Sequence, residues 1–233
     1  MNPRFERTAR LVGEDGLARL AAASVMVVGL GGVGSYAFEA VARAGVGHLI
    51  LVDNDRVDVT NLNRQLLALD STVGRPKAEV ALERLGDINP EARAEARVLF
   101  VDEANVAGLL EGFEGWVIDA IDAVPSKVAL LRQAVLRGIP VVSCMGAAGK
   151  LRTDRIQTAD ISATRVCPLA RAVRQGLRAC GIHRGVRCVF SDETPAGPEG
   201  QTRGPRMGTL APVTAAFGLA AAGEVLRGIL AAD

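Results

Sequence analysis

The sequence predicts an α/β fold in which an open, mostly parallel sheet lies between two layers of helices. As far as Gly146, short apolar runs typical of buried strands alternate with segments of helical periodicity. Apolar residues make up 49% of the chain and aromatic residues only 3%. The core must therefore consist of Val, Leu, Ile and Ala, which suits parallel strands covered on both faces by helices. The 233 residues are enough to build a full hydrophobic core.

A βαβ unit begins the fold. Residues 23–28 (ASVMVV) predict a buried strand, residues 29–34 a glycine-rich turn, residues 35–44 a helix, and residues 48–52 (HLILV) a second strand. The connection between the two strands should be a right-handed crossover. The alternation continues with helices predicted at 76–88, around 103–110 and at 125–137, and with strands predicted at 97–101, 116–119 and 139–144.

The pattern changes in the last third of the chain. Residues 151–158 alternate apolar and polar side chains, which predicts an antiparallel strand near a sheet edge. Residues 168–179 predict an Arg-rich amphipathic helix, residues 186–190 a strand, and the Pro- and Gly-rich residues 193–206 a mobile loop. The predicted fold is a three-layer sheet with a parallel N-terminal half and an antiparallel C-terminal extension, in a single domain over residues 1–233.

Several features restrict the classes of protein. Residues 207–223 carry no charge, but this run is shorter than the ~20 residues of a membrane span and contains Pro212. We expect a loop that leads into a buried Ala-rich helix, and no membrane association. The four cysteines form no CxxC pair, so no zinc site built from two knuckles is expected. Because no basic-then-apolar signal segment is present at the N-terminus, we expect a cytoplasmic location.

The glycine-rich turn predicts a nucleotide site. Gly29, Gly31 and Gly34 match G-x-G-x-x-G between a strand and a helix, and Asp53 ends the next predicted strand. These glycines permit a tight turn and a close approach of phosphate to the helix N-terminus, while the carboxylate can bind ribose hydroxyls. This Rossmann-like motif by itself favours a dinucleotide such as NAD.

Three charged residues after the turn favour a triphosphate instead. Arg64, Lys77 and Asp122 lie near the predicted carboxyl ends of strands, where ligands bind in such sheets. A triphosphate carries nearly twice the charge of a dinucleotide pyrophosphate, so it requires side-chain cations and a metal ion held by a carboxylate. Each residue taken singly also fits an ordinary surface charge. Together they favour ATP with Mg²⁺ over NAD.

Four motifs resemble the ubiquitin-activating-enzyme-like adenylating proteins, which include the activators of sulfur carriers. They are GLGGVGS at Gly29, LVDNDRVDVTNLNRQ at Leu51, VGRPKAE at Val73 and DAIDA at Asp119, and they occur in the same order. The resemblance covers roughly residues 4–150. It implies the fold described above, an ATP-binding part at 1–150, a basic substrate-facing part at 151–233, and activation of a carboxylate as its acyl-AMP.

The resemblance also implies a role for individual residues. Asp53 would bind the ribose, Asn61 and Arg64 the phosphates near the reacting centre, Lys77 the outer phosphates, and Asp122 the Mg²⁺ ion. In the homodimers of this family an N-terminal arginine enters the partner's site, and Arg7 is the corresponding candidate. The predicted catalytic residues are Arg64, Lys77, Asp122 and Arg7, and the predicted ATP-binding residues are Gly29, Gly31, Gly34, Asp53, Asp55, Asn61, Arg64 and Lys77.

The second half of the chain indicates a branch of this family. The sulfur-carrier activators generally carry two CxxC knuckles, which are missing here. The segments SCMGA at Ser143, DISAT at Asp160, CPLAR at Cys167 and VFS at Val189 instead resemble the tRNA threonylcarbamoyladenosine dehydratase branch. That branch implies adenylation of the threonyl carboxylate of the modified tRNA, followed by a cyclising dehydration. Residues 150–206 hold 11 basic and 5 acidic residues, which suits a surface for tRNA phosphates.

Alternatives remain open on the sequence alone. One is adenylation of the C-terminus of a small sulfur-carrier protein, and others are an NAD-dependent oxidoreductase and a non-catalytic partner in a sulfur relay. A sulfur-relay protein is a possible partner for the enzyme as well. Cys144 and Cys167 are open candidates for a nucleophile. Arg171, Arg174 and Arg178 share a helical face that is either a tRNA-facing stripe or a solvated surface.

Overall fold

The computed structural model describes residues 2–195 and 207–231, and these form a seven-stranded sheet with the order β3-β2-β1-β4-β5-β7-β6. All neighbouring strands are parallel except β6, which pairs antiparallel with β7. The predicted fold class is therefore confirmed. The strands are β1 (Ser24–Val28), β2 (His48–Val52), β3 (Arg93–Arg97), β4 (Trp116–Asp119), β5 (Val141–Cys144), β6 (Ile156–Asp160) and β7 (Arg187–Ser191).

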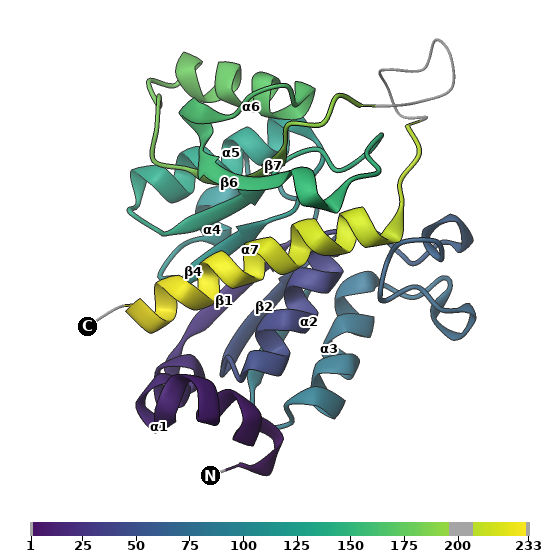
Figure 1. Ribbon diagram of the computed structural model, residues 1–233, viewed down its shortest axis with the longest axis vertical. Helices are drawn as coiled ribbons and strands as arrows, with labels where there is room; N and C mark the ends of the chain where they lie inside the picture. The colour runs from purple at the N-terminus through teal and green to yellow at the C-terminus, as the bar shows by residue number, and fades with distance from the viewer. Residues whose placement is uncertain (1, 196–206, 232–233) are drawn as a thin grey trace.

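Helices cover both faces of this sheet (Figure 1). One hydrophobic core joins the sheet to α1 (Glu6–Ala22), α2 (Gly34–Ala44), α3 (Lys77–Ile88) and α7 (Ala211–Ala231). The other core joins it to α4 (Val106–Leu109), α5 (Val124–Leu136) and α6 (Pro168–Ala179). Successive side chains of a strand point to opposite faces, so Val25 and Val27 lie in the first core while Met26 and Val28 lie in the second.

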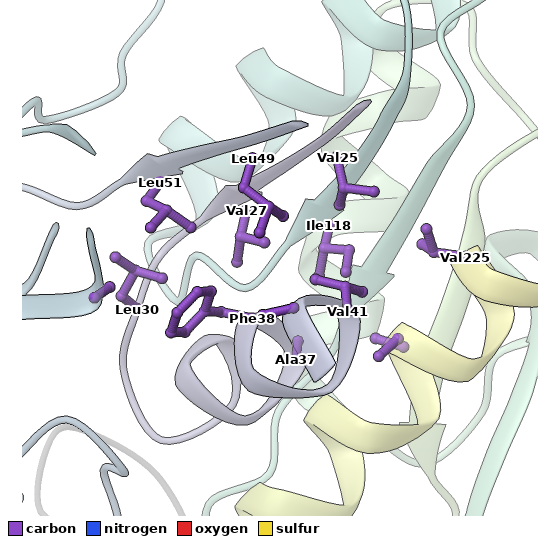
Figure 2. Close-up of a cluster of buried hydrophobic side chains, with 14 of the residues drawn as sticks. Val25, Val27, Leu30, Ala37, Phe38, Val41, Leu49, Leu51, Ile118 and Val225 are labelled. Carbon is purple, nitrogen blue, oxygen red and sulfur yellow. The ribbon is translucent and has the colours of Figure 1, made fainter. Parts of the chain in front are cut away.

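Phe38 shows how the first core is assembled (Figure 2). Its ring rises from α2 towards Val27, Leu49 and Leu51 of the sheet, and all four side chains are fully buried. Val225 comes from α7, far along the chain, and belongs to the same core. Gly34 begins α2 directly after the glycine turn, so this packing also holds the turn at the carboxyl end of β1.

The strand predicted at 97–101 is wrong in its position along the chain. The strand lies at Arg93–Arg97, where alternating Ala and charged residues form a half-exposed edge strand beside β2. An edge strand buries little surface and so needs few apolar residues. The apolar run that follows β3 therefore resembles a strand more than β3 itself does, although it forms no strand. Phe100 in that run is 55% exposed. The helix expected around 103–110 is similarly reduced to the single turn of α4.

The C-terminal extension is an antiparallel edge strand, as predicted, but it begins later than expected. Leu151 is exposed, and a 3-10 turn at Thr153–Arg155 precedes β6. The predicted helix at 168–179 matches α6 in both bounds. Most of the loop predicted at 193–206 lies outside the described residues, because the structure describes the chain only as far as 195 and again from 207.

The helix expected after residue 207 is α7. It is long and apolar enough to cross a membrane by length and composition alone. Its apolar side chains Val213, Phe217, Val225 and Ile229 are buried in the first core, which accounts for this composition. A Cβ added at Gly218 would lie 2.2 Å from the carbonyl oxygen of Val33, so this glycine allows α7 to pack closely on the start of α2.

Candidate active site

A cavity of about 1070 Å³ lies at the carboxyl ends of β1, β2, β4 and β5. Ligands bind at this edge of open α/β sheets, and one small-molecule ligand typically occupies ~300–1,000 Å³. The cavity therefore has room for a nucleotide and part of a second reactant. Most of its lining falls into two parts, a glycine-loop half (residues 28–33, 52–58, 61–65 and 77) and a β5 half (residues 144–150 and 167–169), with residues 120–124 between them.

The three glycines of the turn have different roles. Gly29 has a φ of +89°, and a Cβ there would lie 2.8 Å from the carbonyl oxygen of Ala120. A Cβ at Gly34 would lie 1.7 Å from the carbonyl oxygen of Gly29, so the fold itself requires both glycines. Gly31 lines the cavity, and a Cβ there would meet only Gln65 Nε2, at 3.8 Å. The packing of the protein therefore does not require glycine at 31, in contrast to Gly29 and Gly34.

Asp53 ties the glycine turn to the end of β2. Its Oδ2 accepts a hydrogen bond from the Leu30 amide at 2.5 Å, and its Oδ1 accepts one from the Asp55 amide at 2.7 Å. Burial raises the pKa of Asp53, while the Leu30 amide and the charge of Lys77 oppose that shift. The carboxylate lines the cavity beside the glycine turn, where a ribose-binding group is predicted.

Lys77 carries a buried positive charge into the same half of the cavity. It is only 4% exposed, and its Nζ lies 2.8 Å from Asp55 Oδ2. Lys77 also begins α3, whose N-terminus adds a partial positive charge at this place. The Asp55 side chain is 60% exposed, so the pair joins a fixed cation to a carboxylate at the rim.

Asn61, Arg64 and Gln65 also line the glycine-loop half of the cavity. The Asn61 Oδ1 accepts a hydrogen bond from the Asp58 amide at 3.2 Å, and Arg64 Nη1 donates to the Thr60 carbonyl and to Asn63 Oδ1, both at 2.9 Å. Gln65 has no role predicted from the sequence, yet it is 7% exposed and lines the cavity. Its Oε1 is buried and has no hydrogen-bond partner among the described residues.

Asp122 lies between the two halves, in the loop after β4. Its side chain is exposed and lines the cavity, with no hydrogen bond or ion pair to any described residue. The fully buried Asp119 at the end of β4 holds this loop in place, since its Oδ1 accepts a hydrogen bond from the Ile121 amide at 3.1 Å. Asp119 Oδ2 accepts from Lys127 Nζ at 2.8 Å and from Ser143 Oγ at 2.6 Å, and Lys127 also donates to the Ile121 carbonyl at 2.8 Å. A lysine within the apolar run of α5 is the sequence signal for this support.

The β5 half holds two thiols and a lysine. Burial raises the pKa of Cys144 to about 12, so its thiol stays protonated at neutral pH and is a poor nucleophile. Cys167 is also buried and precedes α6. Lys150, which no sequence motif singles out, is 2% exposed and lines this half.

Eight of the predicted site residues line one cavity: Gly29, Gly31, Asp53, Asp55, Asn61, Arg64, Lys77 and Asp122. Gly34 shapes the turn but does not line the cavity. Arg7 is exposed on α1 and also lies outside the lining, so within one chain the structure does not bring it to the site. No group of three or more His, Cys, Asp or Glu residues that could hold a metal ion occurs within residues 2–195 and 207–231.

Comparison with known proteins decides between the families considered. The sequence matches the ThiF family over residues 5–233. The chain belongs to this family. The resemblance inferred from the four motifs is thereby confirmed, and the dinucleotide-binding oxidoreductase is not supported.

Within the ThiF family, several relatives share most of this chain. It is 47% identical to the tRNA threonylcarbamoyladenosine dehydratase of Bacillus subtilis, over 82% of this chain and 75% of that protein. It is 40% identical to the Escherichia coli protein of the same name, over 98% of this chain and 94% of that protein. The crystal structure of that E. coli enzyme in complex with ATP superposes with a TM-score of 0.91 at 42% identity, covering 98% and 94% of the two chains.

Proposed function

We propose that this protein is an ATP-dependent tRNA threonylcarbamoyladenosine dehydratase. The observation that carries the proposal is similarity over nearly the whole of both chains to an enzyme of this name, which includes a structure with ATP. The residues of the present chain fit that activity. The open space at Gly31, the buried cation Lys77 and the carboxylate of Asp53 provide separate places for phosphate and ribose.

The chemistry begins with a carboxylate on the threonyl group of the modified adenosine. One carboxylate oxygen attacks the α-phosphorus of ATP, and the bond to pyrophosphate breaks. The carboxyl carbon then carries AMP, a far better leaving group than oxide. An atom of the carbamoyl group next attacks that carbon, a proton leaves the carbamoyl nitrogen, and AMP departs with the former carboxylate oxygen. The tRNA has then lost the elements of water, at the expense of ATP cleavage to AMP and pyrophosphate.

Each residue has a place in this scheme. Lys77 and the N-terminus of α3 offset the charge of the outer phosphates, and Arg64 binds the phosphate near the attacked phosphorus. The carboxylate of Asp122 has no partner among the described residues, so it would hold Mg²⁺, which neutralises phosphate charge when bound. Ring closure is intramolecular, so holding the group in place supplies much of its rate. Because the carbamoyl group of the substrate is itself the attacking group, the scheme requires no covalent enzyme intermediate.

The assembly and surroundings follow the same scheme. From the resemblance to the homodimers of this family we infer a homodimer in which Arg7, which lies outside the cavity of its own chain, enters the partner's site. Residues 1–150 bind ATP, and the basic residues 151–233 face tRNA in the cytoplasm.

The arginines of α6 differ in how far they are free to bind tRNA. The guanidinium of Arg174 is already hydrogen-bonded within the protein, since its Nη1 donates to the Thr164 carbonyl at 3.0 Å. Arg171 and Arg178, both exposed, are therefore the members of the predicted stripe that can reach tRNA phosphates.

A second candidate is activation of a sulfur-carrier protein. The chain is 42% identical to the sulfur carrier protein adenylyltransferase of Thermus thermophilus, but over only 56% of this chain and 48% of that protein. That overlap supports a shared adenylating chemistry rather than a shared acceptor. A sulfur-relay protein would on this view be a partner of the enzyme rather than its substrate.

The test is ATP–pyrophosphate exchange with each acceptor in turn. We expect exchange to rise with tRNA that carries threonylcarbamoyladenosine, and to stay at its basal level with the same tRNA lacking the threonylcarbamoyl group. Mass spectrometry of the digested tRNA should show the loss of one water. Stimulation by a sulfur-carrier protein ending in glycine, with none by the modified tRNA, would transfer the assignment to the second candidate.

A further inference from the structure

The three lysines of this chain form a distinct set. Only three of its 27 basic residues are lysine, and Lys77, Lys127 and Lys150 are 4%, 0% and 2% exposed. An ammonium group is costly to bury without a countercharge. Lys77 is paired with Asp55 at 2.8 Å, and Lys127 with Asp119 at 2.8 Å. Lys150 has no ion pair with any residue in the described part of the chain.

Glu193, the residue to which Lys150 is hydrogen-bonded, does not form an ion pair with it. The Lys150 Nζ donates to the backbone carbonyl of Glu193 at 2.7 Å. The side chain of Glu193 turns to the backbone instead, since its carboxylate accepts from the amides of Leu151 at 3.1 Å and Arg152 at 3.0 Å. An ammonium group has three N–H donors, so this contact leaves capacity for a further acceptor.

The surroundings of Lys150 do not neutralise its charge. Burial lowers the pKa of Lys150, against the smaller raising effects of Cys167, Glu193 and Asp192. A lysine in this condition gains most from an anion that enters from the cavity, because such a ligand supplies the missing countercharge.

The start of α6 adds a second attraction for an anion in the same half of the cavity. The N-cap residue Cys167 makes no capping hydrogen bond, and Cys167, Pro168 and Leu169 line the cavity. The turn before it is strained, because Val166 has a φ of +63° and the Cys167 amide bonds to the Arg165 carbonyl at 2.7 Å. An uncapped helix N-terminus carries a partial positive charge, and because Pro168 has no N–H and the Cys167 amide is bonded, the amides that remain are those of Leu169 and Ala170.

We propose that Lys150, together with the N-terminus of α6, binds the carboxylate of the acceptor in the β5 half of the cavity. This assignment rests on the proposed function, in which the acceptor is the threonylcarbamoyl group of tRNA. β5 lies beside β4 in the sheet, so the β5 half adjoins Asp122 and the phosphate end of the nucleotide site. Lys150 holds one carboxylate oxygen, and the other is left to attack the α-phosphorus.

The experiment compares two forms of the substrate that differ in one charge. Binding is measured for tRNA carrying threonylcarbamoyladenosine and for the same tRNA with the threonyl carboxylate converted to its methyl ester. The wild-type protein should prefer the carboxylate form by about 10- to 100-fold, the worth of a charged hydrogen bond. Lys150→Met should lose most of the preference and keep only the part that the N-terminus of α6 contributes, and Lys150→Arg should keep more of it because it keeps the charge.

A matched control is Arg171→Met, which removes an exposed charge from α6. It should weaken the binding of both forms equally and preserve the preference. Circular dichroism and thermal melting identify any variant that fails to fold. If Lys150→Met does not fold, the preference for the carboxylate form is compared between Lys150→Arg and the wild type. A folded Lys150→Met protein that retains the full preference overturns the assignment of Lys150. If the wild type itself neither prefers the carboxylate form nor dehydrates it, the proposed function has failed instead.

Discussion

The two halves of the cavity hold their charges differently. In the glycine-loop half, Lys77 is paired with Asp55, and Asp53 accepts two backbone hydrogen bonds. In the β5 half, Lys150 has no ion pair among the described residues and the start of α6 is uncapped. In the first half Lys77 and Asp53 therefore already have partners, whereas in the second half Lys150 has no carboxylate partner among the described residues. A site with its own countercharges is stable when empty, while an unpaired cation indicates which ligand is missing.

The halves also differ in how they are built. The glycine-loop half consists mainly of residues within a few positions of each strand end, between 28 and 77. The β5 half brings together residues 144–150 and 167–169, which come from separate segments of the chain. Local motifs can therefore be recognised in the first half, and only the folded chain assembles the second.

The largest expected effect comes from the loop between the two halves. Asp122→Asn should lower adenylation by about 100-fold or more, because the amide cannot replace the carboxylate as a Mg²⁺ ligand and phosphate charge stays uncompensated. ATP–pyrophosphate exchange over a Mg²⁺ titration measures this. The matched control is Asp70→Asn, an exposed aspartate outside the cavity, which should be neutral. Undiminished exchange in Asp122→Asn, or in excess chelator, would contradict the metal assignment.

A smaller effect is expected from two glycine variants, which distinguish a glycine that contacts the ligand from one that the fold requires. Gly31→Ala should fold normally, since its Cβ meets only Gln65 Nε2 at 3.8 Å, but it should weaken ATP binding by about tenfold or more. Gly29→Ala should instead lower the free energy of unfolding by about 1–3 kcal/mol, because it places a side chain at a φ of +89°.

Isothermal titration with ATP and denaturant unfolding of both glycine variants provide the comparison. Equal loss of stability in the two variants would show that Gly31 is required by the fold. The close approach of ATP to the turn would then have no support from this residue.

The smallest effect concerns the surface beyond the β5 half. Replacing Arg171 and Arg178 by Ala should flatten the dependence of log affinity for tRNA on log salt by about one to two units, since each phosphate contact releases counterions. Arg174→Ala alone should act on stability, because its guanidinium is hydrogen-bonded to the Thr164 carbonyl. Coinciding salt slopes for wild type and double variant would place the tRNA surface elsewhere, and ATP titration serves as the control.

The sequence by itself determined the fold class, the glycine-loop half and the family. The parallel strands β1, β2 and β4 at the centre of the sheet are mainly apolar runs buried on both faces, and the predicted nucleotide-binding residues lie in short motifs. Such signals are local, since they depend on periodicity and on the few residues after a strand. The order of these motifs, with the family resemblance that they carry, predicts that Asp53 and Lys77 belong to one site, and both residues line the same cavity.

Only the tertiary structure decided the features that depend on distant partners. The weak edge strand β3 takes its register from β2, and the charge of Lys127 is compensated by Asp119 of β4. Lys150 is an ordinary lysine in the sequence, but the structure buries it beside the start of α6 without an ion pair to any described residue. Burial and pairing arise from contacts between segments far apart in the chain, so no local pattern encodes them.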